Sequence, residues 1–183
     1  MRDNHSTTLP VRQAFKSDAF AAAAAAGALG RKLDTREAVK IVALLKSGDP
    51  ATREKAYQTL ARYGGRDYVG YIVRGLNDPD IRIRVETCRL LGDLRAHAVK
   101  RQLYDAVVDR NAYVRCAAAE ALAKMGDKYG LPYVARLVCI SGKHQIEALR
   151  SYNFITGRKF KLGESGVNDA VKWIRHNQGH MLA

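Results

Sequence analysis

Apolar side chains recur every three or four residues along most of the chain, and the core shows no strict alternation of the kind that marks a β-strand. Ile41 and Leu45 fall on one face of an expected helix, and Ala56 and Leu60 fall on one face of the next. This spacing follows the turn of an α-helix and predicts an all-α protein made of helix pairs. The expected helices cover residues 10–29, 35–47, 50–63, 67–77, 80–94, 97–108, 111–125, 130–140, 143–155 and 165–177.

Polar residues stand where several of these helices are expected to begin. Asp34 and Glu37 have the spacing of a capping box, in which each side chain accepts a hydrogen bond from the other residue's backbone N–H. Asp49 followed by Pro50 has the order of an N-cap and a first helical residue. The alanine run 21–26 predicts a helix that lets a neighbour approach closely, because alanine favours helices and has a small side chain. The run differs from a secretory signal, which needs larger apolar side chains.

The expected helix pairs repeat with a period of 31 residues. Because a single pair cannot bury its apolar face alone, we expect stacked pairs to share a continuous core. Columns of small residues in the repeat predict close helix packing. The matching columns are Ile41, Ile72, Leu103 and Val134; Leu45, Leu76, Val107 and Val138; Leu60, Leu91 and Leu122; Ala56, Thr87 and Ala118; and Ala61, Gly92 and Ala123.

Two segments, 78–84 and 109–115, share a more specific pattern: each starts with Asp and ends with an apolar residue followed by Arg. With this pattern the chain resembles HEAT-like repeats of the short bacterial type, over about 39–140 well and 141–157 loosely. The first unit departs from the pattern, with Ser47 at the Asp position, and is typical of an edge repeat. The resemblance implies an α-solenoid, a right-handed superhelix of about four stacked helix pairs with N- and C-terminal capping helices.

The same resemblance sets the expected domain organisation. The ends of the array are expected to be covered, since a stacked core is otherwise open to solvent at both ends. The expected parts are a flexible N-terminus at 1–9, an Ala-rich N-terminal capping helix at 10–33, a HEAT-like array at 34–157, and a C-terminal cap with a basic loop and a helix at 158–183.

The repeated Asp and Arg residues have two interpretations. They could form a basic stripe for a ligand. The family resemblance instead implies a ladder, in which an Arg fork binds several carbonyls or carboxylates and links adjacent units. We favour the ladder, which consists of Arg53, Asp78, Arg84, Asp109 and Arg115.

Candidate binding positions lie between the core columns on the second helix of each unit, which faces the concave surface in HEAT-like solenoids. Their mixed charges and a tyrosine are more typical of a protein-binding surface than of a phosphate track. An ordinary solvated helix face is the alternative. The candidates are Arg82, Glu86, Arg89, Tyr113, Cys116 and Glu120.

The chain is basic, with 31 Lys and Arg against 18 Asp and Glu in 183 residues, a formal net charge of +13. Such a charge favours acidic partners, whether nucleic acid, an anionic membrane surface or an acidic protein. The basic residues are densest near the carboxyl end, where Arg158, Lys159 and Lys161 surround one aromatic residue and could contact phosphate. Apolar residues of the same region are expected to cap the core, namely Phe154, Phe160, Leu162 and Trp173.

Several functional classes find no support in the sequence. Cys88, Cys116 and Cys139 form neither a disulfide framework nor a zinc motif, which favours the cytoplasm. His176 and His180 have the spacing of helical metal ligands but no third ligand accompanies them. We expect no catalytic residues, no cofactor, no metal and no membrane span.

Three functions remain open. The first is a non-enzymatic interaction or scaffold module that binds a protein through its concave face or basic end. The second is a nucleic-acid-binding protein that contacts the phosphate backbone. The third is a bilin-lyase-like or chaperone-like subunit, because HEAT-like repeats of this type also resemble those of phycobilisome lyases.

Overall fold

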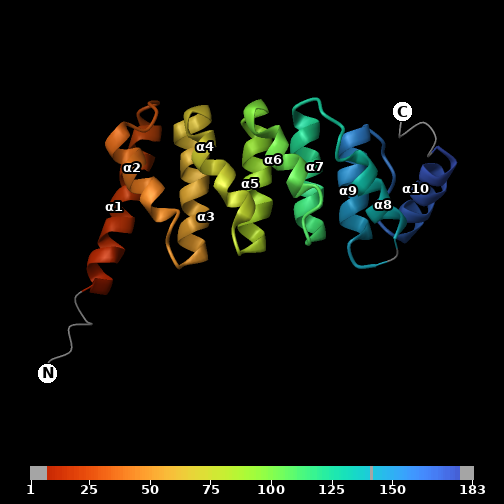
Figure 1. Cartoon of the computed structure of the whole chain (residues 1–183), viewed down its shortest axis with the longest axis horizontal. Coiled ribbons are helices and arrows are strands. Elements are labelled where there is room, and N and C mark those ends of the chain that lie inside the picture. Colours follow the sequence, from red (N-terminus) through yellow and green to blue (C-terminus); the bar gives the residue numbers. More distant parts are fainter. Residues whose placement is uncertain (1–7, 141, 178–183) are drawn as a thin grey trace, which may run out of the picture. The chain divides into compact units, whose positions relative to one another are not determined.

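A computed structural model describes residues 8–140 and 142–177 of the chain, and residues 1–7 of the expected flexible N-terminus lie outside them. The described residues are helical or form turns, with no strand among them, so the all-α prediction is confirmed for this part of the chain (Figure 1). The chain divides into two compact units, 1–72 and 73–183, which are described in turn.

Unit 1 begins with the alanine-rich helix and continues with short helical segments. Ala19, Ala23 and Ala26 are fully buried on one face of the first helix, which packs against the second. The elements are α1 (Thr8–Ala28), α2 (Thr35–Leu44), α3 (Pro50–Thr59), the π-helical turn η1 (Leu60–Gly64), the 3₁₀ turn η2 (Gly65–Tyr68) and α4 (Val69–Ile72).

The starts of α2 and α3 follow the predicted capping chemistry. Asp34 accepts a hydrogen bond from the Glu37 backbone N–H at 2.8 Å, and Glu37 accepts one from the Asp34 N–H at 2.9 Å, which confirms the capping box. The Arg31 guanidinium binds the same Glu37 carboxylate at 2.7 Å and lowers its pKa to about 2. Asp49 caps α3, with Pro50 as its first residue.

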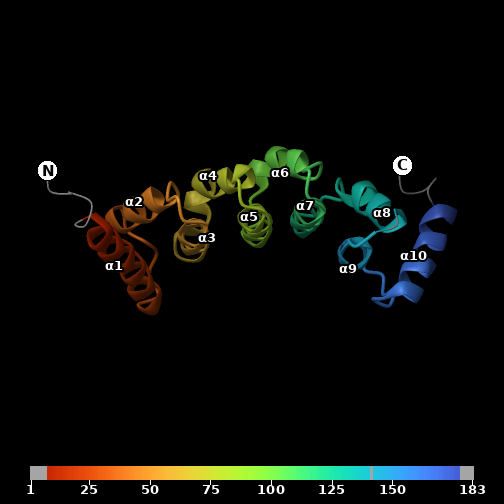
Figure 2. The same ribbon diagram turned by 90° about the horizontal axis from the view of Figure 1, so that it is seen from below.

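Unit 2 consists of helices in two layers. α5, α7 and α9 lie side by side and are seen end-on in Figure 2, with α6 and α8 in the other layer. We refer to α5, α7 and α9 as the second-helix layer. The elements are η3 (Val73–Asn77), α5 (Ile81–Asp93), η4 (His97–Val99), α6 (Lys100–Ala106), α7 (Ala112–Lys124), α8 (Leu131–Cys139), α9 (Gln145–Thr156) and α10 (Glu164–His176).

One predicted helix is wrong in its details. The stretch 67–77 forms η2, α4 and η3 in succession instead of one α-helix. Gly70 and Gly75 fall inside this stretch, and glycine weakens a helix interior because its backbone loses the most freedom on ordering.

The repeat columns supply the core of both units. Within unit 2, Leu103 and Val134 of one column and Leu91 and Leu122 of another are fully buried. Leu45 departs from its column and is only half-buried, as suits the degenerate first repeat. Burial in register explains why a 31-residue sequence period produces one continuous core in unit 2.

α5 and α7 pack so closely that only glycine fits at Gly92. A Cβ there would lie 2.8 Å from Ala121 Cα and 3.0 Å from Ala121 Cβ. We expect Gly92→Ala to destabilise the protein by about 1–3 kcal/mol, because the two helix backbones must separate. Urea unfolding followed by circular dichroism measures this change.

Gly70→Ala is the matched control, because a Cβ at Gly70 meets no atom within 4 Å. It should leave the stability unchanged or raise it by less than about 1 kcal/mol. Equal effects of the two substitutions would show that the α5–α7 contact is not the cause.

Candidate interaction surface

Arg84 connects the start of α5 with the turn that precedes α7. Its side chain is 5% exposed, and its Nη1 donates to the Asp78 carbonyl at 2.9 Å. Its Nε and Nη2 bind the two carboxylate oxygens of Asp109 at 3.0 and 3.2 Å. A planar guanidinium suits this arrangement because it donates to a carboxylate through two parallel N–H groups.

The same backbone contact recurs one repeat later and in unit 1. Arg115 donates to the Asp109 carbonyl at 2.8 Å, and Arg53 donates to the Ser47 carbonyl at 2.9 Å. In each case the acceptor lies six residues before the arginine. The position that corresponds to Asp109 in the following repeat is Ile140, which offers no carboxylate.

The predicted binding residues of the second-helix layer differ in their surroundings. The Arg82 side chain is 73% exposed and binds Asp80 at 3.1 Å. Arg89 is exposed, and Glu86 is half-buried. Glu120 is half-buried and accepts a hydrogen bond from the Ser151 hydroxyl. We call the surface formed by Arg82, Glu86, Arg89, Tyr113 and Glu120 the second-helix face.

Cys116 does not belong to this surface. It is 3% exposed and lies in the core with Ala119 and Tyr152. It falls on the side of α7 that α9 covers, which the local spacing of apolar residues in α7 alone does not reveal.

Tyr113 is the exposed aromatic residue of the second-helix face, with 44% of its surface accessible. Its ring meets the His144 ring edge-on, with 4.9 Å between centroids. His144 was missed by the sequence reasoning, although Arg82, Tyr113 and His144 follow one another at the repeat period of 31 residues. That register is the signal that could have found it.

The basic loop, which contains Arg158, Lys159 and Lys161, lies at the opposite end of α9 from His144. It follows the C-terminus of α9, whose 12 residues span about 18 Å from His144. Asn153 fixes the loop by donating to the Phe160 carbonyl at 2.8 Å and accepting from the Phe160 N–H at 3.2 Å. The second-helix face and the basic loop are therefore separate surfaces of unit 2.

The three cations of the loop are not equivalent. The Arg158 guanidinium stacks on the Trp173 ring at 3.4 Å from its centroid, whereas Lys159 and Lys161 are exposed. Stacking of this kind orients Arg158 while leaving its charge in place.

The four apolar residues expected to cap the core differ in their burial. Phe160 and Trp173 pack against the core of α8, α9 and α10. Phe154 and Leu162 are 52% and 51% exposed, because Tyr152 and Ile155 occupy the core side of α9 and Leu162 lies in the loop.

The thiols are poorly suited to nucleophilic chemistry. Burial raises the pKa of Cys88 to about 12 and that of Cys116 to about 11, so both stay protonated at neutral pH. Burial also raises the pKa of the half-buried Cys139. Within 8–140 and 142–177, no three His, Cys, Asp or Glu side chains gather as metal ligands would. Among the described helices, none has the length and apolar character required to cross a membrane.

We expect iodoacetamide at about pH 8 to modify Cys139 first and to leave Cys88 and Cys116 intact in the folded protein. Both buried thiols should react once urea unfolds the chain. Mass spectrometry of digested samples measures each site. Rapid labelling of Cys88 without denaturant would contradict its burial in α5.

The paired layers and the recurring arginine–carbonyl contacts define a helical repeat protein. Residues 71–138 match the family model of HEAT repeats, which takes in α5, α6, α7 and nearly all of α8. The resemblance inferred from the sequence is therefore confirmed for this stretch. Comparison with curated proteins gives no match. The hand of the superhelix and the two caps stay predictions.

Arg84→Ala should lower the free energy of unfolding by about 3–5 kcal/mol, because it leaves the half-buried Asp109 carboxylate without its guanidinium. Arg84→Lys should recover only part of the loss, since an ammonium cannot bind carbonyl and carboxylate in the same fork. Chemical denaturation provides the measurement.

Arg82→Ala is the control from the same helix, and its exposed ion pair should be worth less than about 1 kcal/mol. An Arg84→Ala protein as stable as Arg82→Ala would refute a structural role for the Arg84 fork.

Proposed function

We propose that the chain is a non-enzymatic interaction module whose second-helix face binds a protein partner. The observation that carries this proposal is the exposed Tyr113 ring on a HEAT-repeat surface with side chains of both signs. Exposed aromatic residues and arginines supply most of the energy of protein interfaces, and tyrosine does so at a low entropy cost. The free thiols support a reducing, cytoplasmic location.

The charges around Tyr113 favour protein over nucleic acid. Arg84 and Arg115 donate to backbone carbonyls, and Lys124 binds Asp93 at 2.5 Å. Glu86 and Glu120 lie on the same helices and would repel phosphates. A phosphate track needs a clear excess of cations, and on this face Glu86 and Glu120 offset Arg82 and Arg89.

The exposed Lys159 and Lys161 support one alternative, contact with a nucleic-acid backbone at the basic loop. Each phosphate contact contributes about −0.9 to the slope of log K against log salt. Replacing both lysines with alanine should therefore flatten the slope by about two if this alternative holds. The bilin-lyase-like or chaperone-like alternative rests on the family resemblance alone.

Tyr113→Ala should weaken capture of the protein partner by about 30-fold or more, the loss expected for a central interface tyrosine. Quantitative mass spectrometry of proteins captured from lysate of the native source, at physiological salt, measures the loss. Tyr129→Ala is the matched control, because Tyr129 is 46% exposed but precedes α8 in the other layer.

Equal loss with Tyr113→Ala and Tyr129→Ala would contradict the second-helix face as the binding surface. Duplex DNA binding at about 50 mM salt that disappears with the Lys159 and Lys161 substitutions would favour the nucleic-acid alternative instead.

A further inference from the structure

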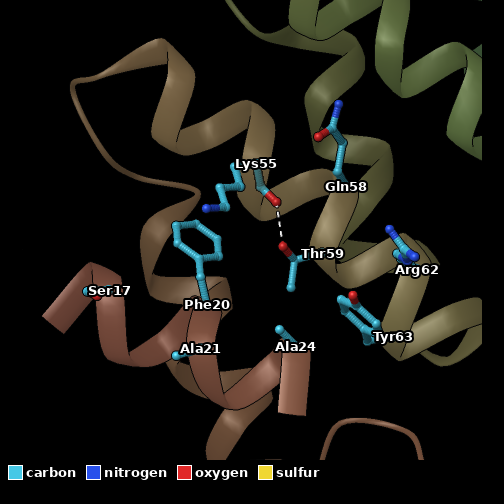
Figure 3. Close-up of a pocket in the computed structure, with 9 residues that line it drawn as sticks. All are labelled: Ser17, Phe20, Ala21, Ala24, Lys55, Gln58, Thr59, Arg62 and Tyr63. Atoms are coloured by element: carbon cyan, nitrogen blue, oxygen red, sulfur yellow. Dashed lines mark hydrogen bonds between the residues drawn. The ribbon is translucent and has the colours of Figure 1, made fainter. Parts of the chain in front are cut away.

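Unit 1 contains a groove between α1 and the segment formed by α3 and η1. Two hollows of about 460 and 570 Å³ adjoin each other, since both are lined by Ala24, Arg62 and Tyr63, and we call them together the α1–α3 groove. Figure 3 shows its first part, with Ala21 and Ala24 on the α1 side and Lys55 and Arg62 on the opposite side.

The floor of the groove consists of alanine side chains, which are small enough for the backbone of another helix to approach closely. Ala21, Ala24 and Ala28 line it at helical spacing. They lie on a different face of α1 from the buried alanines of the same helix. Ala24 is exposed, and Gly27 leaves room for the Tyr63 ring. Helices in contact lie 8–10 Å apart according to the size of the side chains between them, and alanine sets the short end of this range. An apolar floor of this kind offers nothing to a phosphate backbone.

The sides of the groove are cationic. Lys55 Nζ lies 4.5 Å from the Phe20 ring centroid, and the Arg62 guanidinium lies 5.4 Å from that of Tyr63. Arg31 and Lys32 line the second hollow, each with a carboxylate partner outside it. No Asp or Glu is among the residues that line either hollow.

Aromatic support positions these cations without neutralising them. A ring face attracts an ammonium or guanidinium and leaves N–H groups on its other side for a second partner. Lys55 and Arg62 both belong to the segment that faces α1, so an occupant on the alanine floor meets both.

We propose that the α1–α3 groove binds an acidic amphipathic helix of a partner protein. Small or aliphatic side chains of that helix would pack on the alanine floor, as in helix-in-groove recognition. Its Asp or Glu side chains would pair with Lys55 and Arg62. A second copy of α1 complements the groove poorly, because α1 carries Arg12 and Lys16 against Asp18 alone.

The test uses the full chain and a labelled synthetic helical peptide of about 20 residues, long enough to be helical in water, with one Leu and Ala face and glutamates beside it. Fluorescence anisotropy should show binding that weakens as salt increases. Lys55→Glu with Arg62→Glu should raise the Kd at least about tenfold, because the attraction becomes repulsion. Ala24→Trp should abolish binding by filling the floor.

Three controls isolate the groove. Lys46→Glu changes an exposed charge on unit 1 that does not line it and should leave the Kd unchanged. Tyr113→Ala should also leave it unchanged, which separates this proposal from the one for the second-helix face. Circular dichroism of the Ala24→Trp protein should match that of the original.

Equal affinity for a peptide with lysine in place of glutamate would overturn the proposal. So would sedimentation showing a dimer that Ala24→Trp disperses, because a second copy would then occupy the groove. Duplex DNA binding that is lost with the Lys55 and Arg62 substitutions would overturn it in favour of a phosphate backbone.

Discussion

The packing of α5 against α7 in unit 2 depends on the Arg84 guanidinium, which binds the turns before both helices. Arg84 binds the Asp78 carbonyl before α5 and the Asp109 carboxylate before α7, the next helix of the second-helix layer. Gly92 meets Ala121 near the other end of the same two helices. Contacts at both ends fix α5 and α7 in direction and register, and in this register Leu91 of α5 and Leu122 of α7 are both buried in the core. If α7 shifted by one residue relative to α5, the Arg84 guanidinium would lose the Asp109 carboxylate and Gly92 would no longer lie opposite Ala121.

This dependence explains how much of the fold could be predicted. The core columns, the capping box at Asp34 and the cap at Asp49 are local or periodic features, and periodicity is the strongest structural signal in a sequence. The division of 67–77 into short turns was not predicted, because the apolar spacing continues through Gly70 and Gly75. Helix propensity differences of about 1 kcal/mol per glycine decide such a stretch, and pattern matching does not weigh them.

The candidate site was less predictable than the fold, since side-chain environment depends on neighbours from other helices. The spacing within α7 alone places Cys116 among the surface residues, because it does not show that α9 covers this position. The aromatic character of Phe154 suggests a cap residue, but it does not show which side of α9 the residue occupies. His144 was visible only through the repeat register that connects it with Tyr113.

The total of 31 Lys and Arg overstates the number of cations that are available to contact a partner. Arg84 and Arg115 are held by carbonyls, and Lys100 binds Asp127 at 3.0 Å. These contacts hold the side chains against the protein and occupy their N–H groups within the fold. Lys55, Arg62 and Arg158 differ, because each lies over an aromatic ring that orients it without cancelling its charge. A cation already held in place loses less side-chain entropy when an acidic group arrives. The cations best suited to bind an acidic partner are therefore those that lie over an aromatic ring, and in unit 1 two such cations line the groove with the alanine floor.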